Sequence, residues 1–254
     1  MRYMCICKYD GTNFNGFQVQ NKPFEDIRTV QGEIEKALAG VLKEETPIIY
    51  ASRTDEGVHA IGQVFTFDAK IDILEYNMGR AINSMLPEDI FVSKVMKVSD
   101  DFHPRYHSLM KEYHYIINLG EYNPLLRNYM YFPRRKKLDI NAMKKASKYL
   151  IGKHNFKSFC KSSDITNYER EIYEIKLEKK EDVLTVKIKG NGFLRHMVRI
   201  LVAMLLEVGV SNYSPEDLKS ILEQKNRRFA PKILPSSGLY LFKVFYDEEL
   251  LKKA

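Results

Sequence analysis

The sequence contains the run Arg53-Thr54-Asp55-Glu56-Gly57-Val58-His59-Ala60 between two apolar segments. Residues 47–50 before it and the alternating residues 63–68 after it have the pattern of β-strands. The run places a cation, a hydroxyl, two carboxylates, a flexible glycine and a histidine on one connection between strands, and such a concentration of chemical groups indicates a functional site. A charged turn in which Arg53 and Asp55 only satisfy each other would have the same composition. Both interpretations stay open at the level of local composition.

Strands and helices predicted around this run give the first part of the chain the order β-α-β-β-α-β. The spacing of apolar residues predicts a further strand over 1–9, helices over 28–43 and 76–85, and a strand over 90–98. This split arrangement also underlies RNA-recognition folds.

The pattern begins again after residue 105. It predicts strands over 111–118, 171–178, 183–189 and 239–246, and helices over 140–150, 194–208 and from 215 onward. We therefore predict an α+β protein of two similar domains, residues 1–105 and 106–254. Each has a mixed or antiparallel sheet packed with helices in an RRM-like or ferredoxin-like plan.

The composition is that of a basic globular protein. Forty Lys and Arg against 33 Asp and Glu give a formal charge of +7, which favours an acidic partner such as nucleic acid or anionic lipid. The most apolar run, residues 200–206, is far shorter than the about 20 residues that cross a bilayer, and the first residues lack the apolar core of a secretory signal. Three cysteines, an odd and sparse set, fit reduced thiols. We expect a cytoplasmic protein.

Three groups of residues have chemistry that suits a site acting on RNA. A carboxylate such as Asp55 can be a covalent nucleophile when a nearby cation keeps it ionised and oriented. Arg195 and Arg199 lie one helical turn apart, although a solvated helix face has the same spacing. Tyr113 and Tyr115 lie on one face of their predicted strand, where they either join the core or stack on an unstacked base.

Several motifs, taken in chain order, carry a resemblance to a known family. They are Tyr9-Asp10-Gly11-Thr12, Gly16-Phe17-Gln18, Thr29-Val30-Gln31, the run at 53–60 with Gly62-Gln63-Val64, Leu86-Pro87 with Asp89-Ile90, Phe102-His103-Pro104-Arg105, Lys111-Glu112-Tyr113, Gly192-Phe193 with Met197-Val198-Arg199, and Gly238-Leu239-Tyr240-Leu241. As an ordered set they resemble the tRNA pseudouridine synthase A family almost from end to end of the chain.

The resemblance implies an enzyme that isomerises uridine to pseudouridine in structured RNA, most often at positions 38 to 40 of the tRNA anticodon arm. It implies a homodimer of two-domain α+β subunits with a basic RNA cleft between the domains, and it calls for no metal or other cofactor. The first domain would carry Asp55 as nucleophile and Arg53 for base flipping. The second would carry Arg199 as the ion pair to the nucleophile and Tyr113, which packs against the uracil and is a candidate base. The implied substrate-binding residues are Tyr113, His59, Gln63, His103, Arg105 and Leu239.

Departures from the family pattern bear on the substrate more than on the chemistry. Ser52 stands where a glycine is usual, Asn155 replaces a common aspartate, Glu169 precedes Arg170 in place of a small or hydroxyl residue, and residues 230–235 are atypical. A paralogue that modifies ribosomal RNA is therefore an alternative.

Two interpretations from other classes compete with the synthase. One is a non-catalytic RNA-binding module, although a carboxylate facing a polyanion would weaken its binding. The other is a metal-dependent hydrolase using Asp55, Glu56 and His59, but no further ligand stands at a characteristic spacing.

Overall fold

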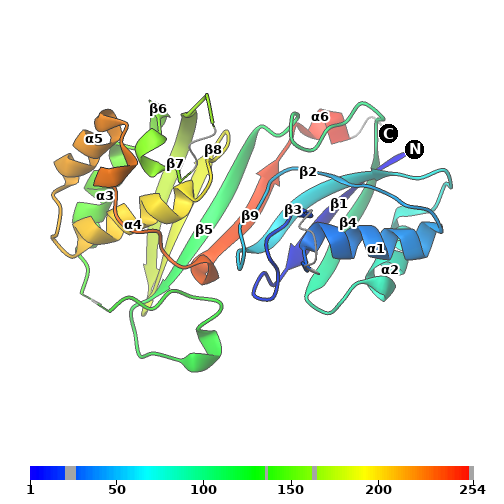
Figure 1. The fold of residues 1–254 in the computed structure, drawn as a ribbon, viewed down its shortest axis with the longest axis horizontal. Helices are drawn as coiled ribbons and strands as arrows, with labels where there is room; N and C mark the ends of the chain where they lie inside the picture. Colours follow the sequence, from blue (N-terminus) through cyan, green and yellow to red (C-terminus); the bar gives the residue numbers. More distant parts are fainter. Residues whose placement is uncertain (21–26, 135–136, 162–164, 252–254) are drawn as a thin grey trace. The chain divides into compact units, whose positions relative to one another are not determined.

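The computed structural model describes residues 1–20, 27–134, 137–161 and 165–251 (Figure 1). Contacts divide the chain into two compact units, one formed by Met1–Leu109 with Tyr240–Ala254 and the other by Met110–Leu239. The described residues combine helices with mostly antiparallel strands, as predicted for an α+β protein.

The first unit contains the predicted β-α-β-β-α-β order with one short strand added by the C-terminal segment. Its elements are β1 (Arg2–Tyr9), α1 (Val30–Leu42), β2 (Ile49–Tyr50), β3 (His59–Asp68), α2 (Glu75–Met85), β4 (Ile90–Val98), β9 (Leu239–Phe245) and α6 (Glu248–Leu251). The strands lie in the order β4-β1-β3-β9, and β2 pairs with β3. β1 pairs with β3 and β4 in antiparallel fashion, so the two ends of the run at 53–60 are tied to one sheet.

Helix α1 forms where its apolar period and its capping residue predict it. The side chain of Thr29 accepts a hydrogen bond from the Gly32 amide, and the helix ends at Lys43, which has a left-handed φ of 59°. Val30, Ile34 and Leu38 fall on the buried face, as the spacing of three to four residues requires. The helix contacts α2, which in turn packs on β4.

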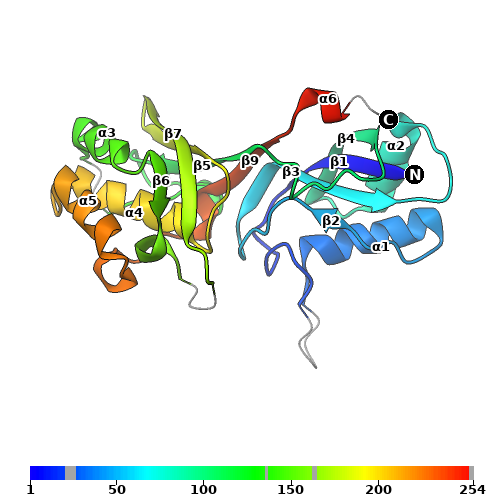
Figure 2. The ribbon, with the colours of Figure 1, turned by 90° about the horizontal axis from the view of Figure 1, so that it is seen from above.

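The second unit is an antiparallel sheet with helices on one side. Its elements are β5 (Met110–Asn118), α3 (Ile140–Lys148), β6 (Gly152–Asn155), β7 (Glu169–Lys180), β8 (Val183–Gly190), α4 (Met197–Gly209) and α5 (Pro215–Gln224), with four short 3-10 turns at Pro124–Leu126, Lys157–Phe159, Arg227–Phe229 and Ser236–Gly238. The strand order is β5-β8-β7-β6. Figures 1 and 2 show α3, α4 and α5 together on one side of these strands.

Helix α4 forms the core of the second unit. Eleven of its thirteen residues are buried, and it contacts α3 and β5. The sequence predicted this helix from residue 194, but it begins at Met197 because His196 adopts a left-handed φ of 61° that a helix cannot include. Within the described residues, no helix combines the length and the apolar character needed to cross a bilayer.

The C-terminal strand differs from its predicted place. The sequence assigned residues 106–254 to one domain, whereas contacts group Tyr240–Ala254 with the first unit. β9 pairs in parallel with β3, with Tyr240 opposite His59 and Leu241 opposite Ala60. A Cβ on Gly62 would lie 2.4 Å from the carbonyl oxygen of Phe242, so a glycine is needed for this approach. The alternation of residues predicts a strand but not its partner.

Candidate active site

The connection between β2 and β3 carries Asp55 on an anchored backbone. Thr54 is buried, and its hydroxyl lies 2.7 Å from the hydroxyl of Tyr9. The carbonyl of Thr54 also accepts a hydrogen bond from the Phe17 amide at 3.1 Å. The neighbours of Thr54 are accessible, because Arg53 is exposed and Asp55 is half-buried. An inward threonine thus holds a carboxylate and a cation at the surface on either side of it.

The end of this loop is a turn that a glycine permits. The Val58 amide donates to the Asp55 carbonyl at 3.1 Å, and Gly57 has a φ of 71°. The Gly57 amide donates to the Phe14 carbonyl at 3.3 Å. The carboxylate of Asp55 therefore stands on a backbone held from within the loop and from a second segment.

Gln63 supports the other end of the loop. Its side-chain amide donates to the Ser52 carbonyl at 2.7 Å, and its side-chain oxygen accepts from the Val64 amide at 3.1 Å. Gln63 is fully buried in β3. The predicted contact between Gln63 and substrate stays a prediction, while the support it gives to Ser52 is a role that sequence reasoning missed.

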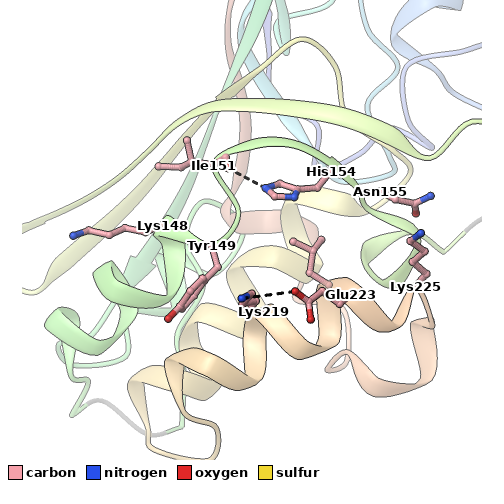
Figure 3. Close-up of a pocket in the computed structure, with 9 residues that line it drawn as sticks. Lys148, Tyr149, Ile151, His154, Asn155, Lys219, Glu223 and Lys225 are labelled. Carbon is pink, nitrogen blue, oxygen red and sulfur yellow. Dashed lines mark hydrogen bonds and ion pairs between the residues drawn. The ribbon is translucent and has the colours of Figure 1, made fainter.

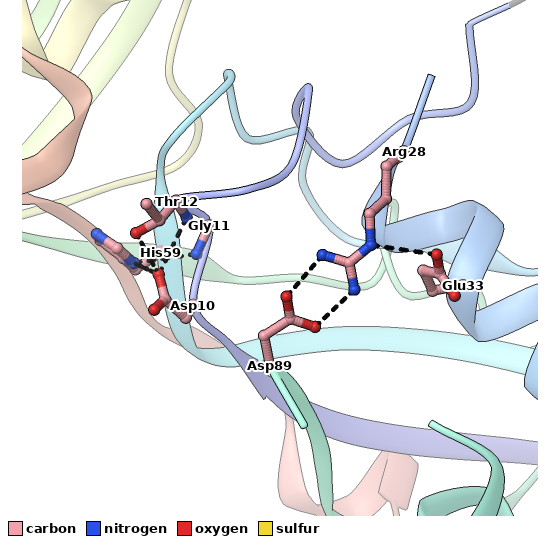
Figure 4. A network of polar contacts seen from close by, with 7 residues as sticks. All are labelled: Asp10, Gly11, Thr12, Arg28, Glu33, His59 and Asp89. Carbon is pink, nitrogen blue, oxygen red and sulfur yellow. Dashed lines mark hydrogen bonds and ion pairs between the residues drawn. The ribbon is translucent and has the colours of Figure 1, made fainter. Parts of the chain in front are cut away.

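The turn Asp10-Gly11-Thr12 packs against the base of the loop (Figure 4). Oδ1 of Asp10 accepts from the amide and the hydroxyl of Thr12 at 3.0 and 2.6 Å. The Gly11 amide donates to Nδ1 of His59 at 3.0 Å, and Oδ1 of Asp10 lies 3.1 Å from the same nitrogen. A Cβ on Gly11 would lie 2.0 Å from the carbonyl oxygen of Val58, so only glycine fits this position.

His59 is a buried residue in this arrangement. It is 2% exposed, and its ring stacks on Tyr240 with centroids 4.8 Å apart. Its contacts with Asp10 and Gly11 join β3 to the turn after β1. A direct contact of His59 with substrate stays a prediction.

The ion pair between Arg28 and Asp89, which sequence reasoning missed, joins two segments that contact residues 10–15. The guanidinium of Arg28 donates to both carboxylate oxygens of Asp89, at 2.6 and 2.9 Å (Figure 4). It also lies 4.1 Å from the centre of the Phe14 ring. The hydrogen bond to Asp89 raises the pKa of Arg28. The Asp10 amide donates to the Asp89 carbonyl at 3.0 Å, and the Asn15 amide donates to the Arg28 carbonyl at 2.9 Å. The pair therefore links the start of α1 and the start of β4 to residues 10–15.

We expect Arg28 and Asp89 to be coupled energetically. In a double-mutant cycle of Arg28→Gln and Asp89→Asn, the coupling free energy of unfolding should be about 1 kcal/mol, because the pair is bidentate but a quarter to a third exposed. Urea unfolding of the four proteins measures it. Additive effects of the two substitutions would show that the pair contributes nothing beyond its separate side chains.

The second unit carries Tyr113 and Arg199 on neighbouring elements. Tyr113 lies in β5, is 6% exposed, and meets the ring of Phe193 edge to face at a centroid distance of 5.1 Å. Arg199 lies in the first turn of α4 and donates from Nε to the Leu234 carbonyl at 2.7 Å. The hydroxyl of Tyr115 donates to the next carbonyl, that of Pro235, at 2.8 Å. Burial raises the pKa of Tyr115, which keeps this hydroxyl a donor.

The remaining predicted residues lie at the surface or at strand ends. His103 accepts hydrogen bonds at Nδ1 from the amides of Arg105 and Tyr106, at 3.1 and 3.3 Å, and burial lowers its pKa. The side chain of Arg105 is exposed, and Leu239 is 5% exposed at the start of β9. Asp55 and Arg53 belong to the first unit, and Tyr113 and Arg199 belong to the second. Their joint action stays a prediction.

Comparison with known proteins places this set of residues in a family. The model of the tRNA pseudouridine synthase family matches residues 6–107 and 146–247. The chain belongs to this family. The matched ranges contain Asp55 and Arg199, and Tyr113 lies between them.

Curated members of the tRNA pseudouridine synthase family match nearly the whole chain. A tRNA pseudouridine synthase A of Pseudothermotoga lettingae is 46% identical over 96% of this chain and 98% of its own length. Proteins of the same name from Bacillus pumilus and Bacillus subtilis are 44% and 40% identical, each over 97% of this chain and 100% of their own length.

Solved structures resemble the chain weakly. A structure described as an H/ACA RNP bound to a substrate RNA containing 2'-deoxyuridine has a TM-score of 0.34 and 11% identity, and the match covers 77% of this chain and 52% of the other. Membership of the tRNA pseudouridine synthase family rests on the sequence matches.

Proposed function

We propose that this protein is a tRNA pseudouridine synthase that isomerises uridine in the anticodon arm. Membership of the family supports the reaction, and relatives named tRNA pseudouridine synthase A support the substrate. The observation that carries the proposal is the loop of Asp55, where Thr54 is buried and hydrogen-bonded while Asp55, the next residue, is only half-buried. A net charge of +7 suits a polyanionic substrate.

The reaction replaces one bond to C1′ by another and leaves the number of protons in the nucleotide unchanged. The glycosidic bond between C1′ and N1 breaks, the uracil turns, and a bond forms between C1′ and C5. C5 loses its proton and N1 gains one. The carboxylate of Asp55 attacks either C1′ of the ribose or C6 of the uracil, and neither path involves a change of oxidation state or calls for a cofactor.

Each further residue has a proposed part in this reaction. Arg199 forms the ion pair that keeps Asp55 ionised and oriented. Tyr113 packs against the flipped uracil and is a candidate base for the C5 proton. Arg53, exposed beside Asp55, fills the stack that the flipped base vacates and so offsets the unstacking cost of a few kcal/mol.

Anchoring of the loop favours this chemistry for a physical reason. A nucleophile held near its attack position does not lose conformational freedom in the transition state, and a small misplacement is costly in rate. The loop of Asp55 is held by Tyr9 at Thr54 and by Gln63 at Ser52.

We also propose, on the family resemblance, a cytoplasmic homodimer in which both units of each chain contact the RNA in a basic cleft.

Mapping pseudouridine in total RNA incubated with the purified protein tests the proposal. Chemical labelling followed by sequencing should report product in tRNA anticodon arms with the native protein and none with Asp55→Ala. Product only in ribosomal RNA would identify the paralogue with a changed target. RNA binding without product in any RNA would mean that the protein is a binding module.

The ribosomal alternative has one specific observation in its favour. Asn155 and Glu169, two of the departures from the family pattern, are register partners in the β6–β7 pair. An altered RNA contact at this place on the second unit would account for both changes together.

A further inference from the structure

A basic groove lies on the second unit, and its lining contains none of the residues assigned to catalysis (Figure 3). It has a volume of about 370 Å³ and is lined from three elements: the end of α3, the strand β6 and the last turns of α5. Its lining includes Lys148, Tyr149, His154, Lys219, Leu222 and Lys225. None of these residues takes part in the reaction described above.

Charge is the first property of the groove. Lys148 ends α3, whereas Lys219 and Lys225 belong to α5 and its C-cap. Glu223 is the one acidic side chain that lines the groove within the described residues. Glu223 lies 3.9 Å from Lys219, and both side chains are more than half exposed, so this pair is weak. The lining therefore carries more positive than negative side chains, which favours an anionic ligand.

The walls of the groove are joined by a buried hydroxyl. Ser158, fully buried just after β6, donates to the Ile221 carbonyl at 2.7 Å and accepts from the Asn226 amide at 2.8 Å. These bonds fasten the end of α5 to the turn that follows β6. Two walls of the groove are therefore held together by the protein itself, which lowers the entropic cost of ordering them when a ligand binds.

The remaining lining suits a nucleotide. Tyr149 and Leu222 provide aromatic and apolar surface beside the lysines, and His154 is held by a hydrogen bond to the Ile151 carbonyl at 2.9 Å. Lysine ammonium groups bind phosphates as point charges, without demanding one geometry, while a base or ribose packs on the apolar wall. A volume of about 370 Å³ is at the small end of ligand sites.

We propose that this groove binds the phosphodiester backbone of the substrate RNA at a point outside the catalytic site. The inference rests on the proposed function for the identity of the RNA. The groove adds affinity and orients the RNA, and its lysines touch no reacting atom.

A competing explanation for the lysines is structural. Lys148 and Lys225 lie at the C-terminal ends of α3 and α5, where a cation also stabilises the helix dipole. If the lysines had only that role, their substitution would lower the stability of the protein and leave its affinity for RNA unchanged. One experiment that measures RNA affinity therefore distinguishes the two explanations.

The test compares two triple variants with equal loss of charge. Lys148→Gln, Lys219→Gln and Lys225→Gln remove the groove lysines, and Lys36→Gln, Lys70→Gln and Lys94→Gln remove three exposed lysines from the first unit. Filter binding of unmodified tRNA over a range of salt concentrations gives the dissociation constant and its salt slope. The groove variant should bind tRNA about tenfold more weakly than the control at low salt. Its slope of log K against log salt should be shallower by about 2, because binding releases about 0.7 to 0.9 counterions for each phosphate that a lysine neutralises. Its single-turnover rate at saturating RNA should be unchanged.

Equal affinity of the two triple variants would overturn the proposal. If the groove variant does not fold, the charge reversal Lys219→Glu at an exposed position replaces it, with the same expected weakening and the same consequence if affinity is unchanged. A triple Lys→Arg variant should retain affinity. If the native protein binds tRNA through the groove but forms no pseudouridine, the proposed function fails while the groove proposal stands.

Discussion

Asp55→Asn is expected to lower pseudouridine formation by at least about a thousandfold, because the substitution removes the proposed covalent nucleophile and keeps the size of the side chain. The neutral amide also removes a negative charge from the RNA-facing surface, so affinity for tRNA should be equal to or slightly tighter than that of the native protein. A single-turnover assay with labelled tRNA measures the rate, and filter binding measures the affinity.

A neighbouring carboxylate is the control for Asp55. Glu56→Gln makes the same chemical change at an exposed position one residue away and should leave the rate within a few-fold of the native value. Comparable loss of rate in both variants would mean that the charge of the loop matters and not one nucleophile. Equal loss of rate and of affinity in Asp55→Asn would mean that Asp55 holds the RNA and does not react with it.

Gly11→Ala is expected to destabilise the protein by about 3 kcal/mol and to lower the rate about a hundredfold. The new methyl group would lie 2.0 Å from the carbonyl oxygen of Val58 and 2.5 Å from its carbonyl carbon, so the backbone of the two segments must separate. That movement breaks the hydrogen bond from the Gly11 amide to His59 and displaces the loop that carries Asp55. Urea unfolding and the single-turnover assay measure the two effects.

Gly79→Ala in α2 provides the matched control. Its new methyl group would meet Val95 at 3.3 Å, a contact with the end of a side chain, and alanine favours a helix over glycine by about 1 kcal/mol. This variant should be at least as stable as the native protein and equally active. If Gly11→Ala behaves like Gly79→Ala, the turn at 10–12 does not position the loop.

Local patterns were sufficient for most of the helices and strands. Thr29 before an apolar period predicts α1, and the structure has the cap and the buried face that this pattern requires. Ser214 followed by Pro215 and two acidic residues predicts the start of α5, where Ser214 and Asp217 form a capping box. These features depend on residues within one or two turns of each other, which is why the sequence is enough to predict them.

The candidate site also has a part that the sequence predicts and a part that it does not. The run at 53–60 identifies Asp55 as a candidate because its chemical groups are adjacent in the chain. The residues that support this run lie elsewhere in the chain, and their types do not indicate which residues they contact. Nothing local to Gln63 identifies Ser52 as its partner, and nothing local to Arg28 identifies Asp89. Their roles come from tertiary contacts.

The last strand is the clearest case of a feature that tertiary structure decides. The alternation over residues 239–246 predicts β9 correctly as a strand, but any strand with free edges could accept it. Its pairing with β3, about 180 residues earlier in the chain, places Tyr240 against His59 and groups β9 with the first unit. Residue types and their periodicity therefore determined the elements and marked Asp55 as a candidate, because these depend on neighbours in the chain. Pairing and support of the loop were decided by packing, because they depend on which surfaces meet.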